Sequence, residues 1–148
     1  MYIRAMFDQG ALPVLEKCVS FYERRNRVLA NNIANADTPN YLRRDLPVAE
    51  FQAQLAKAIE QRAMTNPRVF HFEASRNVEP NALGGVNART IIDPLNRDQF
   101  LRHDGNNVNI DQEMAELAKN DLMHSTMTQI LIKEFNMLST AISEKITK

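Results

Sequence analysis

The hydrophobic residues of this chain form helical stripes at its two ends, whereas the stretch between them shows no such pattern. In both stripes, large side chains recur at alternating spacings of three and four residues. A seam of this kind requires a second helix, because each side chain must fit into a hole on a partner. We therefore predict that both ends pack against other helices rather than catalyse a reaction. The N-terminal stripe comprises Leu12, Leu15, Val19, Tyr22, Asn26, Leu29 and Ile33, and the C-terminal stripe comprises Ile110, Met114, Leu117, Asp121, His124, Thr128, Leu131, Phe135, Leu138 and Ile142.

The residues that punctuate the chain indicate where these two helices begin and end. Pro13 suits a first helical turn, where its missing N–H costs no hydrogen bond, and the first helix is expected to end near Asn35. The last helix is expected to begin near Asn109 or Asp111, since either side chain can cap an N-terminus, and to run to the end of the chain. At about 1.5 Å per residue it is about 50 Å long, against about 33 Å for the first helix. Part of the C-terminal stripe must therefore face something outside the chain.

The segment between the stripes predicts less regular structure. A shorter helix is expected at about 48–63, and from 64 to 107 the periodicity disappears. Within that stretch, residues 68–72 and 88–92 can each form a short strand and pair with one another. So long a connection is usually functional or disordered, and we expect much of it to be mobile in the isolated subunit. The apolar face of the shorter helix comprises Val48, Phe51, Leu55 and Ile59.

These patterns predict a mainly α fold of paired long N- and C-terminal helices, coiled-coil-like, with a largely irregular middle segment. That segment holds a short helix and a small β-hairpin. Residues 1–36 and 108–148 are expected to form one terminal helical core domain. Residues 37–107 are expected to form an intervening segment made of a motif loop, the short helix and a flexible stretch over 64–107.

Polar side chains interrupt both stripes and leave two interpretations open. At Asn26, a buried asparagine fixes the register of the paired helices at some cost in stability, or the seam drifts off the interface and the side chain is solvated. At Asp121, His124 and Thr128 we favour solvated side chains.

The charge and the apolar runs of the chain limit the kinds of partner it can bind and the compartments it can enter. Its 18 basic residues balance 18 acidic ones, so no concentrated positive field attracts nucleic acid or an anionic membrane. The basic residues Arg24, Arg25, Arg27, Arg43 and Arg44 lie beside acidic ones and are interpreted as solvated faces. No apolar run approaches the roughly 20 residues that a membrane helix requires, so no membrane insertion is expected. The absence of a secretory signal indicates the cytoplasm, unless a dedicated export route reads another address.

Residues capable of chemistry are few and scattered, which makes an enzyme the least supported class. The only cysteine, Cys18, is interpreted as a small, half-buried helix residue that cannot form an internal disulfide. His71 and Glu73 have a spacing found in some metal sites but lack a third ligand, so a small metal-dependent enzyme is a weak alternative. The sequence from Asp104 begins like a calcium loop but lacks the glycine and the glutamate that such a loop requires. No catalytic, metal-binding or cofactor-binding residue is predicted, and no cofactor is expected.

The end of the first helix carries the most specific motif in the chain. Residues 29–41, LANNIANADTPNY, resemble the N-terminal motif of bacterial flagellar axial proteins, the rod, hook and hook-associated family. The residue between the proline and the tyrosine is usually glycine; here it is Asn40, which tolerates positive φ. A basic residue usually follows the tyrosine, whereas this chain has Leu42. The motif residues are Asn31, Asn32, Asn35, Thr38, Pro39 and Tyr41.

Within that family, the chain resembles the proximal-rod subunits. Its length leaves no room for the large middle domain of hook and distal-rod proteins. Residues 65–68 resemble a central motif of this subgroup, and residues 104–108 followed by 113–118 resemble its entry into the C-terminal helix. Another proximal-rod subunit is the nearest alternative, and a cytoplasmic helical adaptor or export chaperone is a more distant one.

The resemblance implies a structural protein rather than an enzyme. Such proteins leave the cytoplasm through the flagellar type III export apparatus without a cleavable signal peptide. They polymerise in the periplasm, with copies of themselves and other rod subunits, into the drive shaft that transmits motor torque. At the rod base, the partner is the MS ring or its adaptor protein. The terminal helices pair to form the inner layer of the tube.

We therefore expect the seams to form an assembly interface that neighbouring subunits complete. One hairpin of mismatched helices is marginal alone, so the free subunit is expected to be largely disordered and to order on incorporation. Leu131→Asp, in the most apolar part of the C-terminal seam, is expected to block rod assembly while leaving synthesis intact. The predicted interface residues are Leu12, Leu15, Val19, Tyr22, Leu29, Ile33, Leu117, Leu131, Phe135, Leu138 and Ile142.

Overall fold

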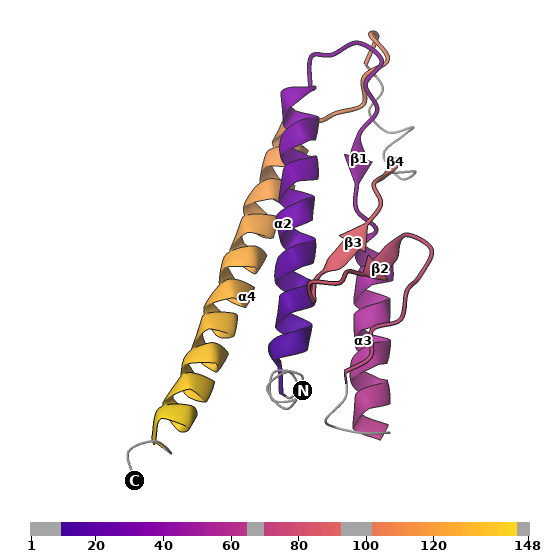
Figure 1. Ribbon diagram of the computed structural model, residues 1–148. Helices are drawn as coiled ribbons and strands as arrows, with labels where there is room; N and C mark the ends of the chain where they lie inside the picture. Colours follow the sequence, from indigo (N-terminus) through magenta and orange to yellow (C-terminus); the bar gives the residue numbers. More distant parts are fainter. Residues whose placement is uncertain (1–9, 65–69, 93–101, 145–148) are drawn as a thin grey trace.

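The structure, a computed structural model, describes residues 10–64, 70–92 and 102–144. Parts of the expected domains 1–36 and 108–148, and the whole of the motif at 65–68, therefore lie outside the described residues. The helix expected at about 48–63 is present, and the elements are shown in Figure 1. In chain order they are α2 (Leu12–Ala34), β1 (Arg44–Asp45), α3 (Val48–Met64), β2 (Val78–Pro80), β3 (Val86–Ala88), β4 (Ile91–Ile92) and α4 (Ile110–Glu144).

Helix α2 lies in the middle of the molecule, between α4 on one side and α3 with the strands on the other (Figure 1). The two terminal helices run antiparallel, because Asn32 near the end of α2 contacts Glu113 at the start of α4, whereas Tyr22 contacts Asn120 further along. The predicted fold class is confirmed: the terminal helices pair, and the middle segment holds a shorter helix and a small hairpin. Among the helices that the structure describes, none is both long and apolar enough to cross a membrane.

The terminal helices differ in length, as their sequences predict. Helix α4 has 35 residues and α2 has 23, so they are about 52 Å and 35 Å long. Figure 1 shows α4 inclining away from α2 towards its C-terminal end. The distal part of α4 therefore extends past the beginning of α2 instead of being matched by it.

The apolar core lies between α2 and the middle segment, not between the two terminal helices. Phe21 of α2 is fully buried and stacks on Phe51 of α3, with ring centroids 4.1 Å apart and planes 4° from parallel. Val78 and Val86 of the hairpin close the core from the other side. Phe21 is outside the predicted seam, because α2 buries a second face that the three-and-four spacing of the first did not reveal. The core comprises Cys18, Phe21, Leu46, Phe51, Ala58, Phe72, Val78 and Val86.

The strands pair differently from the sequence-based expectation. Strands β2 and β3 form an antiparallel hairpin in which Val78 lies opposite Ala88, and β1 pairs antiparallel with β4, Arg44 opposite Ile92. The predicted pairing of 68–72 with 88–92 is therefore wrong where it can be examined, since residues 70–72 are in no strand. The physical reason is burial: Phe72 is a core side chain, so this segment packs its rings against the core rather than joining a ladder.

Cys18 gives a chemical probe of this core. The residue is buried rather than half-buried as predicted, and burial raises the pKa of its thiol to about 11. Because only the thiolate is nucleophilic, we expect iodoacetamide at pH 8 to label Cys18 about 100-fold more slowly in the native chain than in the urea-unfolded chain. The native rate is expected to rise with pH until the thiol ionises. Mass spectrometry measures the labelling rates, and equal rates in the native and unfolded chains would contradict this packing.

Candidate functional site

Two loops meet where the terminal helices come together, one leaving α2 and the other entering α4. Asn106, in the second loop, is fully buried and ties them together. Its side-chain Nδ2 lies 3.0 Å from the carbonyl oxygens of Asn35 and Ala36 and 2.9 Å from that of Thr38. These carbonyls belong to the loop that follows α2, so one amide group from a distant segment holds this loop in place. Arg102 adds a donor, because its Nη1 lies 2.9 Å from the carbonyl oxygen of Ala36.

The closest approach of the two loops depends on two residues with positive φ. Asn40 has φ of 59°, as the motif predicts, and Gly105 has φ of 77°. The backbone N–H of Asn40 donates to the carbonyl oxygen of Asp104 at 2.9 Å, and that of Tyr41 closes the turn onto Thr38 at 3.3 Å. A Cβ atom on Gly105 would lie 2.6 Å from Oδ1 of Asn40, so any other residue there strains the backbone and also displaces the exposed Asn40 side chain.

Gly105→Ala is therefore expected to destabilise the chain more than an ordinary glycine substitution. It combines the cost of positive φ with displacement of the Asn40 side chain, which together give about 2–3 kcal/mol of lost unfolding free energy. The matched control is Gly10→Ala, because Gly10 has φ of 75° but no heavy atom within 4 Å of the added Cβ. The control is expected to lose only about 1–2 kcal/mol. Urea denaturation of both variants measures the difference, and equal losses would contradict the loop contact.

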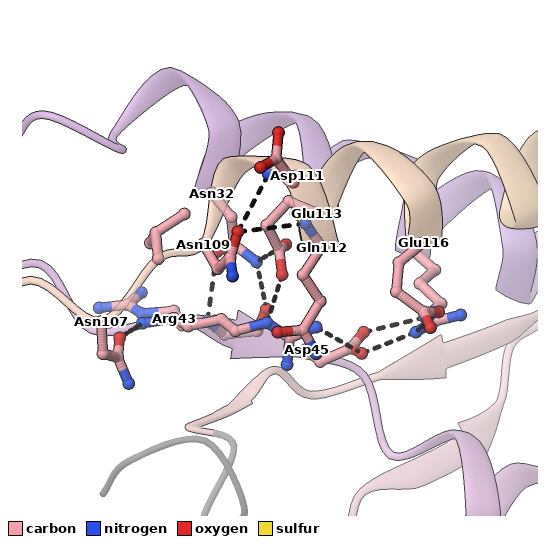
Figure 2. A network of polar contacts seen from close by, with 12 residues as sticks. Asn32, Arg43, Asp45, Asn107, Asn109, Asp111, Gln112, Glu113 and Glu116 are labelled. Carbon is pink, nitrogen blue, oxygen red and sulfur yellow. Dashed lines mark hydrogen bonds and ion pairs between the residues drawn. The ribbon is translucent and has the colours of Figure 1, made fainter. Parts of the chain in front are cut away.

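Below the loops, a buried polar cluster joins α2, β1 and α4 (Figure 2). Asn32 uses all of its hydrogen-bonding capacity: Nδ2 donates to the carboxylate of Glu113 at 2.7 Å and to the carbonyl oxygen of Arg44 at 2.6 Å. Its Oδ1 accepts from the Tyr41 hydroxyl at 3.0 Å and from the Arg44 N–H at 3.2 Å. The motif residues Asn32 and Tyr41 therefore act as a connector between three segments.

Glu113 and Arg43 form the most deeply buried ion pair of this cluster. Glu113 is 0% exposed and Arg43 is 3% exposed, and Nε of Arg43 donates to Oε1 of Glu113. The backbone N–H of Arg43 donates to Oδ1 of Asn107 at 2.6 Å, which fixes the strand against the loop before α4. An ion pair taken out of water is tolerated only when further hydrogen bonds complete it, as here.

Arg25 of α2 forms a second ion-pair cluster with Asp45 and Glu116, both of which are labelled in Figure 2. Its Nε and Nη2 reach the two carboxylate oxygens of Asp45 at 3.0 and 2.8 Å, and Nη2 reaches Glu116 at 3.0 Å. Burial opposes its charged form, but the hydrogen bonds with Asp45 and Glu116 outweigh burial and raise the pKa of Arg25. The interpretation of Arg25 and Arg43 as solvated is wrong, because carboxylates distant in sequence bury and pair both side chains.

Further polar contacts join α2 and α4. Asn109 caps α4 as predicted, its Oδ1 accepting from the N–H groups of Asp111 and Gln112. Asn120 donates to the carbonyl oxygen of Tyr22 at 2.9 Å. Asn26 is half-buried and donates to exposed Asp121, so it is neither fully buried nor simply solvated. A polar interface of this kind fixes one register, because any slip separates buried partners.

The other motif residues and the predicted interface residues fall into distinct environments. Asn35 donates through Nδ2 to the carbonyl oxygen of Asn31 at 2.7 Å and accepts from the hydroxyl of Thr38 at 3.2 Å, while Pro39 is exposed. Of the predicted interface residues, some are unavailable to a neighbour because the chain itself buries them. Buried are Leu12, Leu15 and Leu29; half-buried are Val19, Tyr22, Ile33, Leu117, Leu131 and Leu138; exposed are Phe135 and Ile142.

Several apolar residues outside the predicted interface are exposed on the outer face of α4. Leu122 is 68% exposed, Ile132 54% and Met137 50%, and Met114 of the predicted stripe is 58% exposed. These side chains lie outside the groups that contact α2. The signal was present in the sequence, because α4 carries more large apolar residues than one stripe can accommodate. A hollow of about 600 Å³ runs along this face and is lined by Gln129, Ile132, Lys133, Asn136, Met137, Thr140 and Ala141.

The weak chemical candidates gain no support from their surroundings. Glu73 pairs with Lys57 at 2.6 Å, and hydrogen bonding to that ammonium group lowers the pKa of the carboxyl. His71 is exposed. Within residues 10–64, 70–92 and 102–144, no three histidine, cysteine or acidic side chains gather as a metal site would require.

Comparison with known proteins identifies the class of this chain. Residues 24–41 match the family described as flagella basal body rod protein, which defines the class. The chain is 34% identical over 125 residues to the flagellar basal body rod protein FlgB of Borrelia hermsii, covering 80% of this chain and 84% of that protein. It is 33% identical to FlgB of Aquifex aeolicus, covering 86% and 88%, and 28% identical to FlgB of Bacillus subtilis, covering 90% and 94%. The chain belongs to the FlgB family of flagellar basal-body rod proteins.

Proposed function

We propose that this chain is a structural subunit of the proximal rod of the bacterial flagellum and has no catalytic role. The observation that carries the proposal is the outer face of α4, where Met114, Leu122, Ile132 and Met137 are at least half exposed. Exposed apolar side chains gathered on one element mark a surface that another protein covers. Membership of the FlgB family supplies the identity of that protein: other rod subunits.

The arrangement of the terminal helices supports polymerisation rather than a closed dimer. One side of α4 is occupied by α2 through polar contacts, and its apolar outer face points away from the subunit. A neighbouring subunit is expected to pack its own α2–α4 pair on this face. The two surfaces in contact are then different parts of the subunit. Such a heterologous contact propagates as a helix instead of closing on itself, which suits a tube.

The finer features of the proposal follow from the family. The subunit is exported by the flagellar type III apparatus and enters the periplasmic part of the basal body. It contacts copies of itself, other rod subunits, and the MS ring or its adaptor protein at the rod base. Assembled in this way, it transmits motor torque along the drive shaft.

Fractionation of basal bodies tests this function. We expect the chain to purify with intact hook–basal bodies and to be lost from them when the rod is dissociated with acid. Cells lacking the chain are expected to make no hook. A stable dimer that remains in the cytoplasm, with normal basal bodies in its absence, would favour the helical adaptor instead.

The structure reduces the part of the free subunit that we expect to be disordered. The core around Phe21 and Phe51 is formed within one chain, whereas the distal part of α4 extends beyond α2. We therefore expect amide hydrogen exchange of the purified chain to be slow in α2 and α3 and fast beyond about residue 130 of α4. Exchange that is uniformly fast would restore the broader expectation of a disordered subunit.

A further inference from the structure

A polar pocket of about 370 Å³ lies between α2 and the base of the β2–β3 hairpin. Tyr22 and Asn26 of α2 contact α4, and Arg24 lies two residues from each of them. Two residues correspond to about 200° around a helix, so Arg24 points away from α4. The pocket is therefore on the opposite side of the subunit from the outer face of α4. Its lining comprises Arg24, Ser75, Arg76, Asn77, Val78, Glu79, Asn87, Ala88 and Arg89.

The charge of this lining is unbalanced. Arg24, Arg76 and Arg89 contribute three guanidinium groups, against one carboxylate from Glu79. None of the three forms an ion pair within 4 Å in the part of the chain that the structure describes, although the charge of Arg76 also acts on the nearby Glu50 carboxylate. This differs from Arg25, which three carboxylate contacts satisfy. A guanidinium keeps its charge at any physiological pH and presents five donors, so the pocket, whose Arg24 and Arg89 form no ion pair among the described residues, carries a permanent capacity to bind an anion.

One wall of the pocket is held in place without a ligand. Glu50, in the first turn of α3, accepts from the Ser75 hydroxyl, from the Asn77 N–H at 2.9 Å and from Asn77 Nδ2 at 2.8 Å. The hydrogen bond from Ser75 is the largest contribution that lowers the pKa of Glu50, and burial partly opposes it. The Ser75 N–H also donates to the carbonyl oxygen of Val78 at 2.7 Å, and the Arg89 N–H to that of Asn77 at 2.8 Å. A wall fixed in this way loses little entropy when it binds a ligand.

We propose that this pocket binds a side-chain carboxylate presented by an acidic peptide segment of a neighbouring protein subunit. Arginine forks match the two oxygens of a carboxylate, and the volume admits one or two side chains rather than a folded domain. Glu79 in the lining disfavours a long polyanion such as nucleic acid. The proposal rests on the proposed function, because rod assembly is what brings an acidic segment of another subunit to this face. Assembly then uses two unlike contacts on opposite sides of the subunit, one apolar and one charged.

Chemical footprinting of assembled rods tests the occupancy of the pocket. Phenylglyoxal modifies accessible guanidinium groups, and mass spectrometry compares Arg24 and Arg89 with Arg27, which is exposed on the same helix. We expect the Arg24 to Arg27 and the Arg89 to Arg27 ratios of modification rates in basal bodies to be about one-tenth of those in the purified full-length chain. Unchanged ratios would overturn the proposal.

Titration of the purified full-length chain tests the ligand chemistry. We expect a hexaglutamate peptide to shift the arginine Nε–H resonances saturably and a hexaglutamine peptide to have no effect. Arg24→Gln and Arg89→Gln are each expected to weaken binding about tenfold, whereas Arg27→Gln leaves it unchanged. Binding of inorganic phosphate or cell-wall muropeptides without binding of hexaglutamate would overturn the proposal. If the chain is absent from basal bodies the proposed function fails, but the titration still decides whether the pocket binds carboxylates.

Discussion

Glu113→Ala is expected to lower the free energy of unfolding by about 3–5 kcal/mol, the largest effect of any single substitution considered. The substitution leaves the Arg43 guanidinium buried with no carboxylate at Nε, and it removes the acceptor of Asn32 Nδ2 on α4. Both groups then lose partners in a place that water does not reach. Urea denaturation followed by circular dichroism measures the loss. The variant is also expected to abolish swimming, because the terminal helices no longer hold one register.

Glu116→Ala is the matched control for this effect. Glu116 lies one turn along the same helix and also pairs with an arginine, but 30% of its side chain is exposed. Arg25 keeps both of its bonds to Asp45 when Glu116 is removed. The control is therefore expected to lose about 1 kcal/mol or less. If the two variants are equally destabilised, burial is not what makes the Glu113 contact important.

The double substitution Ile132→Asp with Met137→Asp is expected to prevent incorporation into the rod without unfolding the subunit. Both side chains are at least half exposed on the outer face of α4, so their loss costs the isolated chain little. In an assembled apolar interface each new carboxylate loses its water, at a cost of several kcal/mol. We expect normal cellular amounts of the variant, an unchanged urea midpoint, no variant in basal bodies and no motility.

Asn136→Asp separates the loss of apolar contact from the gain of charge. Asn136 lines the same hollow as Ile132 and Met137, and aspartate has nearly its shape. The control adds one carboxylate where a polar amide already stands and loses no apolar contact, so it is expected to weaken assembly much less than the double variant. The earlier candidate, Leu131→Asp, is a less specific test, because Leu131 is half-buried and its substitution affects folding as well as assembly. Motile cells carrying the double variant would exclude this face as an interface.

The features that depend on neighbouring residues in the chain could be predicted from the sequence. The helix bounds follow from local apolar spacing, the Asn109 cap from its position before α4, and the positive φ of Asn40 from the motif. Each is decided by a few consecutive residues, and local chemistry was enough to identify it.

The features that depend on distant residues could not be predicted in this way. Arg43 and Glu113 are 70 residues apart, and nothing in either local sequence indicates that one will neutralise the other. Phe21 was missed for a related reason, since α2 buries one face against α4 and another against Phe51. A helix that packs on two sides carries two overlapping apolar stripes, and only the stripe with the larger number of residues was recognised.

The polar boundary between α2 and α4 has a mechanical consequence. Two helices joined only by apolar side chains can slide past one another by one turn, about 5.4 Å, because a leucine finds a similar hole there. A ladder of charge pairs and amides has a single matching position, so axial shear meets a steep barrier. In a rod built from such subunits, as proposed, each α2–α4 pair resists axial sliding, so deformation of the rod falls on the contacts between subunits.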